Sequence, residues 1–419
     1  ASVVYKRQQI ECGQAYIDGS LTPPPSKSHS LRAIIAALLA HSPTKIANLS
    51  HCDDIKAACD ASEKLGAVWR DGVIYPPERF ASSARIDCRD SAAALRFFTC
   101  LAACLDGRYV LTGSKRLLSR PMDALIKTLS CCGATVDGPA GGEIVVNGPL
   151  RPAKGIINID GLITSQFISG MLLASPLLPS ETRIGTKNCI SPGYVDMTLR
   201  VMSDFGKKVV FNDGFFVAAE GGYHSAGNVS IVADSSAAAF FAVAAAIAGR
   251  VKITGLDLSF PQPDSEIFAI LASAGAEVVH DGGTIAVCRK TLSRIAVGCD
   301  LTPDLAPVAA VAGAFSENGA EILHADRLTT KESDRKKAVM EMICSLGGRA
   351  EYKNGSIIVY GGGLKGGFVR TYGDHRIAMS AAVAATACPY KVIIDDGDCV
   401  SKSYPEFWRD YRALGGRVY

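Results

Sequence analysis

The chain has 419 residues, of which 48% are hydrophobic and 20% are charged, and its formal net charge is +3 at pH 7. This composition excludes an intrinsically disordered protein, and the scattered Lys and Arg residues argue against a nucleic-acid-binding protein. The longest apolar run, SSAAAFFAVAAAIAG, is shorter than the ~20 residues that a membrane-spanning helix needs, and the N-terminus has no signal-peptide pattern.

We therefore expect a well-cored globular protein of two or three domains that lies in the cytoplasm and has no membrane partner. The fourteen cysteines lack the C-x-x-C spacing of a zinc site, and several lie in apolar helical stretches. They are expected to be free, reduced and buried thiols, without a disulfide framework or a bound metal.

A sixfold repeat organises the chain. Each repeat reads as an apolar helix, a strand, an amphipathic helix and two strands, with a glycine directly after the amphipathic helix. The apolar helices are predicted to begin at Ser28, Asp90, Thr164, Asp234, Pro303 and Asp374. The amphipathic helices are predicted over 53–65, 120–132, 193–205, 263–274, 333–346 and 405–414. The glycines recur about 70 residues apart, at Gly66, Gly133, Gly206, Gly275, Gly347 and Gly415.

The last repeat lacks one strand, whereas residues 2–19 read as two strands without a helix. We expect the N-terminal strands to complete the sixth repeat, so that the chain closes on itself. This predicts two halves of three repeats each, 20–226 and 1–19 plus 227–419, joined near Gly19 and Ala226. Two crossings of this kind suggest a hinge that closes a cleft.

The starts of the apolar helices are unusually polar. In LTPPPSKSHSLRAIIAALLA, a serine cap explains Ser26, Ser28 or Ser30, but cations are disfavoured at the positive end of a helix dipole. Serines and cations together suggest a bound anion. Arg96 repeats the pattern in the second apolar helix. If the helix starts converge, they form a positive pocket with Lys27, Arg32, Arg120, Lys331, Arg335, Arg376 and Lys402, which suits a small ligand with several negative charges.

Two carboxylates stand among these cations, and each is a candidate proton carrier. Asp304 opens one apolar helix, and Glu332 lies between Lys331 and Arg335 in KESDR. The plainer interpretation of KESDR is a helix cap with surface salt bridges. GGGLKG (361–366) matches the letters of a dinucleotide-binding motif, but no helix pattern follows it, so we expect no dinucleotide cofactor.

Seven stretches resemble, in chain order, motifs of the 5-enolpyruvylshikimate-3-phosphate synthase family. They are PSKSHSLRA, SRPMDAL, TSQF, SPGYVDMT, KESDR, YGDHRIAMS and CVSKSYPEF, and they span nearly the whole chain. The resemblance implies an α/β (α+β) protein with two domains, an inside-out α/β barrel of six βαβαββ repeats, and an active site between the domains. It also implies small-molecule substrates and neither a metal nor an organic cofactor. Because the cleft between the two halves is self-contained, we expect a monomer.

The reaction implied by the resemblance is transfer of the enolpyruvyl group of phosphoenolpyruvate to the 5-hydroxyl of shikimate 3-phosphate, by addition and then elimination of phosphate. Asp304 would take the hydroxyl proton, Glu332 and Lys27 would handle the proton at C3, and His375 would lie close by. The residues implied to hold shikimate 3-phosphate are Lys27, Ser28, Arg32, Thr164, Ser165, Gln166, Ser191, Tyr194, Asp304 and Lys331. Those implied to hold phosphoenolpyruvate are Lys27, Ala92, Arg120, Gln166, Arg335, Arg376 and Lys402.

The sequence departs from the family pattern in several places. Asp90-Ser91-Ala92-Ala93-Ala94-Leu95-Arg96 lacks the family's glycine and hydroxyl before the helix arginine, Arg327 replaces a common asparagine, and Pro25 replaces a common glycine. Thr164-Ser165 replaces paired serines but keeps the hydroxyl. The extra methyl group of Ala92 should weaken binding of bulkier competitors such as glyphosate.

Two other interpretations remain. The sister enolpyruvyl transferase that acts on UDP-N-acetylglucosamine shares the architecture, but its reactive cysteine is absent from LTGSKRLLSRP. A non-catalytic anion-binding protein would fit the altered 90–94 segment. It would have no need for both Asp304 and Glu332 in a cationic pocket.

Overall fold

The computed structural model describes residues 8–139 and 142–419. Residues 1–7, in the predicted N-terminal strands, and residues 140–141, in the second predicted hairpin turn, lie outside the described residues. The chain divides into two compact units. Unit 1 combines the N-terminal segment up to Pro24 with Ala233–Leu258 and Gln262–Tyr419, and unit 2 comprises Pro25–Val232 and Ser259–Pro261.

Each unit is built from three repeats with the order βαβαββ, in agreement with the predicted sixfold repeat. Every repeat contributes to a separate four-stranded sheet. The first two strands of the repeat pair in parallel. The last two strands pair antiparallel, and they form a hairpin wherever both come from the same repeat. Among the strands of the described ranges, no sheet closes into a barrel.

The sheets of unit 2 are formed by segments that are mostly close in sequence. The first has the order β14 (Asn228–Ser230), β3 (Thr44–Ala47), β5 (Val73–Tyr75), β4 (Val68–Arg70). The second has the order β6 (Ser83–Asp87), β7 (Arg108–Thr112), β9 (Ile144–Asn147), β8 (Thr135–Asp137). The third has the order β10 (Ile156–Asp160), β11 (Thr182–Lys187), β13 (Phe215–Ala218), β12 (Val209–Asn212).

The sheets of unit 1 follow the same plan. The fourth has the order β16 (Glu277–Asp281), β17 (Thr284–Cys288), β15 (Gly249–Thr254), β2 (Ile17–Leu21). The fifth has the order β18 (Ile295–Gly298), β19 (Ala320–Leu323), β21 (Ser356–Val359), β20 (Ala350–Lys353). The sixth has the order β22 (Gly367–Val369), β23 (Val392–Ile394), β1 (Ile10–Gly13), β24 (Arg417–Val418).

The N-terminal strands are only partly as predicted. β1 completes the sixth sheet, where it pairs with β23 and β24. The expectation that the second N-terminal strand joins the same sheet is wrong, because β2 pairs in parallel with β15 of the fourth sheet. β14 plays the corresponding role in unit 2, where it pairs with β3. β2, which opens the first repeat in chain order, therefore belongs to the sheet of the fourth repeat. β14, which opens the fourth repeat in chain order, belongs to the sheet of the first repeat.

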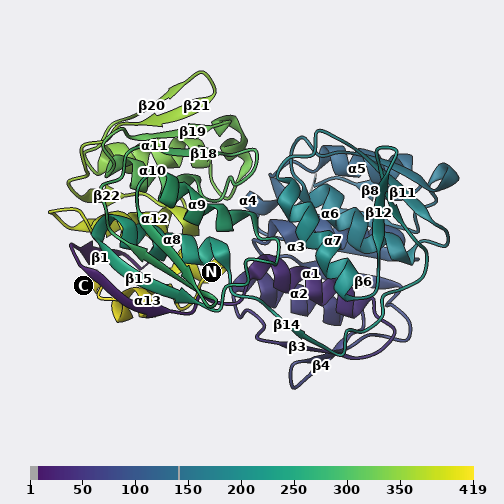
Figure 1. Ribbon diagram of the computed structural model, residues 1–419. Helices are drawn as coiled ribbons and strands as arrows, with labels where there is room; N and C mark the ends of the chain where they lie inside the picture. Colours follow the sequence, from purple (N-terminus) through teal and green to yellow (C-terminus); the bar gives the residue numbers. More distant parts are fainter. Residues whose placement is uncertain (1–7, 140–141) are drawn as a thin grey trace, which may run out of the picture. The chain divides into compact units, whose positions relative to one another are not determined.

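The six apolar helices form the interior, as their composition predicts. Every residue of α10 and α12 is buried, and in α8 every residue except Ser236 is buried. Figure 1 shows α8, α10 and α12 grouped inside unit 1, where they pack on one another. These helices are α1 (Lys27–Leu38), α3 (Ala92–Cys104), α6 (Gln166–Ala174), α8 (Ser235–Ala248), α10 (Ala306–Ala314) and α12 (His375–Ala385).

The amphipathic helices also form where the sequence predicts them. The glycine after each one has a positive φ, between 76° at Gly206 and 109° at Gly66, as a left-handed helix end requires. These helices are α2 (Asp53–Lys64), α5 (Asp123–Cys131), α7 (Pro192–Asp204), α9 (Glu266–Ser273), α11 (Arg335–Ser345) and α13 (Phe407–Ala413). The short helices are α4 (Lys115–Leu118), η1 (Ala153–Gly155), η2 (Ser175–Leu177), η3 (Pro263–Ser265), η4 (Ala325–Thr330) and η5 (Asp398–Lys402).

The segment Ser259–Pro261 is a short excursion of the chain into unit 2. Its phenylalanine, Phe260, is 3% exposed and stacks on the ring of His29, with 4.2 Å between the ring centroids. The guanidinium of Arg200 lies over the Phe260 ring, 5.6 Å from its centroid. The chain therefore passes between the units four times and not twice, which the sequence did not predict.

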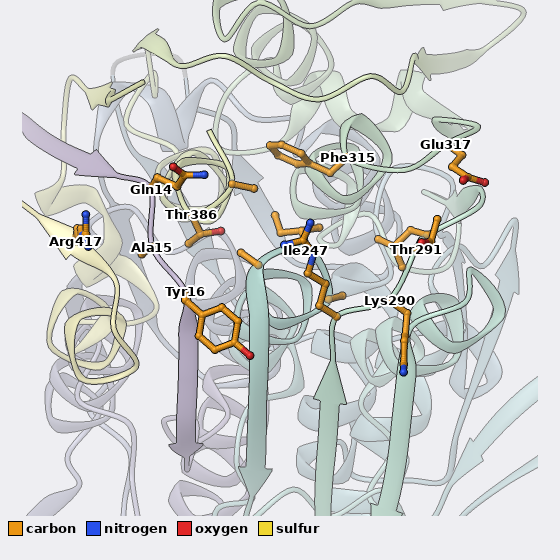
Figure 2. Close-up of a pocket in the computed structure, with 15 residues that line it drawn as sticks. Gln14, Ala15, Tyr16, Ile247, Lys290, Thr291, Phe315, Glu317, Thr386 and Arg417 are labelled. Carbon is orange, nitrogen blue, oxygen red and sulfur yellow. The ribbon is translucent and has the colours of Figure 1, made fainter. Parts of the chain in front are cut away.

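A cavity of about 850 Å³ lies in unit 1 at the C-terminal ends of its buried helices (Figure 2). Ile247, Phe315 and Ala387 contribute apolar surface, and Arg289 and Arg417 are exposed at its edge. Cations at this place complement the negative ends of the helix dipoles. The cavity contains none of the predicted site residues, and those of unit 1, such as His375 and Arg376, lie at the opposite, N-terminal side of this helix group.

All fourteen cysteines are free thiols, and eight of them are buried. Within the described ranges, none of the helices has both the length and the hydropathy of a membrane span. The same ranges contain no group of three or more His, Cys, Asp or Glu side chains arranged to hold a metal ion.

Candidate active site

The predicted site residues lie in both units. In unit 1 they gather at the starts of α10, α11 and α12, and in unit 2 at the starts of α1, α3, α6 and α7. We call these sets half-site 1 and half-site 2. Half-site 1 is centred on Arg335, Asp304, Glu332, Asp374 and Arg376.

Arg335 is the centre of half-site 1, and its side chain has no exposed surface. Its guanidinium donates from Nη1 to Asp304 Oδ1 at 2.8 Å, from Nη2 to Glu332 Oε2 at 2.5 Å and from Nε to Asp374 Oδ2 at 2.9 Å. Although burial opposes the charged form, the three carboxylates raise the pKa of Arg335 above its ordinary value. The guanidinium is therefore a permanent cation that holds the two predicted proton carriers at a fixed separation.

Asp304 is shared between two arginines. It accepts from Arg376 Nη2 at 2.8 Å as well as from Arg335, and its side chain keeps 23% of its exposure. Burial favours the neutral acid, but the charges of Arg376, Lys331 and Arg335 together hold the pKa of Asp304 well below its usual range. Asp304 is thus an anion at neutral pH, aligned by two fixed donors.

Asp374 is a functional residue of half-site 1 that the sequence analysis did not identify. It is fully buried, and it caps α12 by accepting from the backbone N–H of Arg376 at 3.0 Å. It also accepts from the Ser333 hydroxyl at 3.0 Å and from Arg335. An aspartate at a helix start reads as an ordinary cap, so the sequence alone does not reveal that it also fixes Arg335.

The remaining predicted residues of unit 1 lie around this cluster. His375 is 1% exposed, with its Nδ1 3.9 Å from Asp374 Oδ1. Lys331 acts on Asp304 through its charge, and Lys402 is buried at the end of η5, which packs against α12. The structure therefore brings Asp304, Lys331, Glu332, Arg335, His375, Arg376 and Lys402 into one region of unit 1.

A second aspartate that the sequence analysis missed lies beside this cluster. Asp264, in η3, is 1% exposed and accepts a hydrogen bond from the hydroxyl of Ser236 at the start of α8. The sequence PQPDSEI reads as the capped start of an amphipathic helix, and that pattern gives no indication of a buried carboxyl.

In half-site 2, Ser26 is the capping serine of α1, since its Oγ accepts from the backbone N–H of His29 at 3.4 Å. Lys27 forms an ion pair with Asp54 at 3.1 Å, and the lysine and aspartate side chains are 19% and 7% exposed. The cation at this helix start is therefore balanced by a carboxylate of α2. Ser28 is half-buried at the same helix start.

Arg32 joins three helices of unit 2. Its guanidinium donates to Thr198 Oγ1 at 2.8 Å, to the Ser28 carbonyl at 2.9 Å and to the Tyr194 carbonyl at 3.0 Å. It lies over the Phe97 ring, and burial lowers its pKa to about 10. Arg32 thus fixes α1 against α7, and its implied contact with shikimate 3-phosphate stays a prediction.

The starts of α3 and α6 are also linked. Arg96 donates to Gln166 Oε1 at 2.6 Å and to the carbonyl of Pro121, which follows Arg120. Thr164 Oγ1 accepts from the backbone N–H of Gln166 at 3.2 Å, and Ser165 precedes α6 as its cap residue. Gln166 and the loop that carries Arg120 are therefore held together by Arg96.

The altered segment 90–94 is ordered by its own polar contacts. Ser91 caps α3 by accepting from the backbone N–H of Ala94 at 3.3 Å, and Asp90 accepts from the Ser114 hydroxyl. Ala92 is the first residue of α3 and is 6% exposed. The methyl group that distinguishes this chain from the family pattern thus lies at the helix start, where the resemblance implies phosphoenolpyruvate.

Ser191 has a strained backbone. It precedes α7 with φ 48° and ψ 57°, the left-handed region, which costs a non-glycine residue on the order of 1 kcal/mol. Its carbonyl accepts from the backbone N–H of Tyr194 at 3.1 Å. Both residues belong to the set that the resemblance implies for shikimate 3-phosphate.

Comparisons with known proteins identify the family of the chain. The sequence model of the EPSP synthase (3-phosphoshikimate 1-carboxyvinyltransferase) family matches residues 12–411. The chain is 35% identical to the 3-phosphoshikimate 1-carboxyvinyltransferase of Clostridium beijerinckii, over 96% of both chains. It is 34% identical to the enzyme of that name from Thermococcus kodakarensis, over 95% of this chain and 98% of the relative.

The fold is also that of a solved structure. An EPSP synthase from Acinetobacter baumannii superposes with a TM-score of 0.80, covers 98% of this chain and is 24% identical to it. The family match and the named relatives together assign an enolpyruvyl transferase of the shikimate pathway, which serves aromatic amino acid biosynthesis. The chain belongs to the EPSP synthase (3-phosphoshikimate 1-carboxyvinyltransferase) family, whose members transfer the enolpyruvyl group of phosphoenolpyruvate to shikimate 3-phosphate.

Proposed function

We propose that half-site 1 and half-site 2 act on the same pair of substrates and that the reaction is an addition followed by an elimination. The observation that carries this proposal is the ion cluster of half-site 1, in which Arg335 bridges Asp304 and Glu332 and Arg376 pairs with Asp304. The addition needs a base for the 5-hydroxyl and an acid at C3, and the cluster offers a carboxylate for each.

The assignments to substrates follow the family resemblance, position by position. Shikimate 3-phosphate is held by Lys27, Ser28, Arg32, Thr164, Ser165, Gln166, Ser191, Tyr194, Asp304 and Lys331. Phosphoenolpyruvate is held by Lys27, Ala92, Arg120, Gln166, Arg335, Arg376 and Lys402. Because these residues belong to both units, substrate binding brings the two half-sites together and excludes water.

The proton transfers use the carboxylates of half-site 1. Asp304 takes the proton of the 5-hydroxyl as its oxygen attacks C2, while Glu332 and Lys27 deliver a proton to C3, with His375 nearby. The tetrahedral intermediate then loses phosphate from C2, while Glu332 and Lys27 take a proton back from the C3 methyl group, so that the double bond of the enolpyruvyl group forms again. Fixed guanidinium groups such as Arg335 and Arg376 stabilise the negative charge throughout, and preorganised charges of this kind usually make the largest contribution to catalysis.

The first experiment is a phosphate-release assay with the purified protein, phosphoenolpyruvate and shikimate 3-phosphate. Release that requires both substrates and falls at least about 100-fold in Glu332→Gln supports the transferase and its proton carrier. Glu317→Gln is the matched control, since Glu317 lies at the cavity in Figure 2 and not in a half-site. Absence of release, together with calorimetric binding of shikimate 3-phosphate, would instead support the anion-binding alternative.

We further propose that the protein is a cytoplasmic monomer. A single chain carries both half-sites, and fourteen free cysteines suit a reducing compartment. Sedimentation velocity of the intact protein, at concentrations that span the assay, tests the monomer, and a concentration-dependent second species would contradict it.

A further inference from the structure

Asp264 is a buried carboxyl with too few hydrogen-bond donors. Its Oδ2 accepts from the Ser236 hydroxyl, whereas its Oδ1 has no hydrogen-bond partner within 8–139 and 142–419. The side chain is 1% exposed. An ionised carboxylate needs several donors to replace the water that it loses on burial, so a single donor favours the neutral acid.

The segment that carries Asp264 is held rigidly against the start of α8. Gln262 accepts from the backbone N–H of Ser235 at 3.2 Å and donates to the carbonyl of Ala233 at 2.8 Å. Two residues later, Asp264 contacts Ser236, the one residue of α8 that is not buried. The carboxyl therefore has a defined position next to the only polar, partly accessible side chain of that helix.

η3, which carries Asp264, packs against α8 and α9, and four groups of unit 1 act on Asp264 through a hydrogen bond or through charge. From α8 and its cap come Ser236 and Asp234, from the segment before α10 comes Asp304, and from α12 comes Arg376. Burial is the main cause that raises the pKa of Asp264, and the charge of Asp304 adds to it. Arg376 and the Ser236 hydrogen bond oppose this shift, and the resulting pKa is about 6.

Asp304 is a weak base, because its carboxylate is paired with two arginines. Its hydrogen bonds to Arg335 and Arg376 stabilise the carboxylate and lower its affinity for the substrate proton. A negative charge nearby would raise that affinity again. Glu332 is one negative charge that already raises it, and Asp264, a buried carboxyl beside the start of α8, can supply a second.

Resting on the function proposed above, we propose that Asp264 is a positioning residue that acts through Asp304. In acidic solution it carries a proton; after it has lost this proton, its negative charge strengthens Asp304 as the base for the 5-hydroxyl. Asp264 touches no substrate in this scheme. The proton of the hydroxyl still passes to Asp304, and the bond that forms is still the one between the 5-oxygen and C2.

The test compares Asp264→Asn with the parent enzyme across pH. The asparagine cannot ionise, so the ratio of parent kcat to variant kcat should be near one at pH 5 and about ten at pH 8, with a midpoint near pH 6. KM for phosphoenolpyruvate should change by less than about twofold, because Asp264 touches no substrate and Asp304 is not among the residues assigned to phosphoenolpyruvate. Asp281→Asn, on an exposed strand end of the same unit, is the control and should leave the ratio at one throughout.

Ser236→Ala provides a second variant that keeps the carboxyl and removes its donor. The ionised form loses the hydrogen bond from the Ser236 hydroxyl, so the midpoint of the kcat profile should move to higher pH. An unchanged midpoint, or an Asp264→Asn profile parallel to that of the parent, would overturn the inference. If Asp264→Asn does not fold, the midpoint of Ser236→Ala decides the question.

Infrared difference spectroscopy separates this inference from the proposed function, because it requires no turnover. A carboxylic C=O band that is present at pH 5, lost by pH 8 and missing from Asp264→Asn supports the proton on Asp264. Phosphate release without this band overturns the inference alone. A titrating band without any phosphate release overturns the proposed function, and with it the kinetic role of Asp264.

Discussion

Arg335 and Asp374 form an ion pair in which neither side chain has any exposed surface. Two hydrogen bonds join them, from Nε to Oδ2 at 2.9 Å and from Nη2 to Oδ1 at 3.3 Å. Because Asp374 also caps α12, the pair ties the start of α11 to the start of α12. Asp374 carries no proton in the proposed reaction, but it fixes Arg335. Through Arg335 it therefore also fixes the two predicted proton carriers, Asp304 and Glu332.

Asp374→Asn should destabilise unit 1 by about 3 kcal/mol, because breaking a buried pair leaves Arg335 with less compensation. Ser333→Ala removes only one hydrogen bond to the same carboxylate and should cost about 1 kcal/mol. Urea unfolding monitored by Trp408, in a Trp69→Phe background, reports on unit 1 alone. Glu277→Gln, in an exposed ion pair, is the surface control and should have little effect. Equal costs for the first two variants would mean that Asp304 and Glu332 suffice to balance Arg335.

Acidification should destabilise unit 2 through His29. Burial, with the charges of Arg32 and Arg200, lowers the pKa of His29 to about 3, below its ordinary value of 6.5. Since the unfolded chain binds the proton more tightly, stability is complete above pH 6.5 and falls by up to about 4 to 5 kcal/mol as pH decreases toward 3. Trp69 fluorescence in a Trp408→Phe background follows unit 2.

His29→Phe should flatten this dependence of unfolding free energy on pH, since it keeps a ring against Phe260 but has no titrating nitrogen. His280→Phe, on an exposed strand of unit 1, serves as the comparison. A slope that is equally steep in His29→Phe would show that the acid sensitivity of unit 2 comes from other groups.

Asp264 should have the opposite effect on unit 1. Its pKa is raised from 3.8 to about 6, so the folded state binds the proton more tightly and stability decreases as pH rises from 4 to 6. Asp264→Asn removes this loss and should be more stable than the parent by about 3 kcal/mol at pH 8, with a much smaller difference near pH 4. Trp408 fluorescence during urea unfolding, at pH 4 and at pH 8, measures the free energy of unfolding of the parent and of the variant. A variant that is less stable at pH 8 would contradict this sign.

Ala92→Gly should increase inhibition by glyphosate by about tenfold or more, because it removes a methyl group from the helix start implied to face phosphoenolpyruvate. Inhibition curves at fixed phosphoenolpyruvate measure the change. Ala93→Gly, one position further along the same helix, controls for the general effect of a glycine at the start of α3. Equally strong inhibition of the parent and of Ala92→Gly would contradict the prediction that the Ala92 methyl group weakens glyphosate binding.

Much of the fold could be predicted from the sequence, because its information is local. The glycines that end the amphipathic helices have the positive φ that their positions predict, and the apolar helices are buried. The exchange of β2 and β14 could not be predicted, since IDGSL and NVS have weak strand patterns and their partners are distant in the chain. Strand pairing of this kind is decided by tertiary packing and not by the segment itself.

The candidate site shows the same division. Polar residues at the starts of the apolar helices identified Asp304 and Arg376, and KESDR before an amphipathic helix identified Glu332 and Arg335. The structure joins all four. Asp374 and Asp264 were missed because an aspartate at a helix start is sufficiently explained as a cap. Only side-chain distances reveal that one fixes Arg335 and that the other is a buried acid beside Ser236.

The excursion of Ser259–Pro261 limits how the protein can be divided genetically. A gene fragment that encodes Pro25–Val232 would contain nearly all of unit 2 but not Phe260, and the face of the His29 ring would be left uncovered. The complementary fragment would carry Phe260 without the surface on which it stacks. Separate expression of the halves therefore requires either grafting the three residues onto the first fragment or replacing both aromatic partners, and a clean two-piece split of this enzyme is not available from the chain order alone.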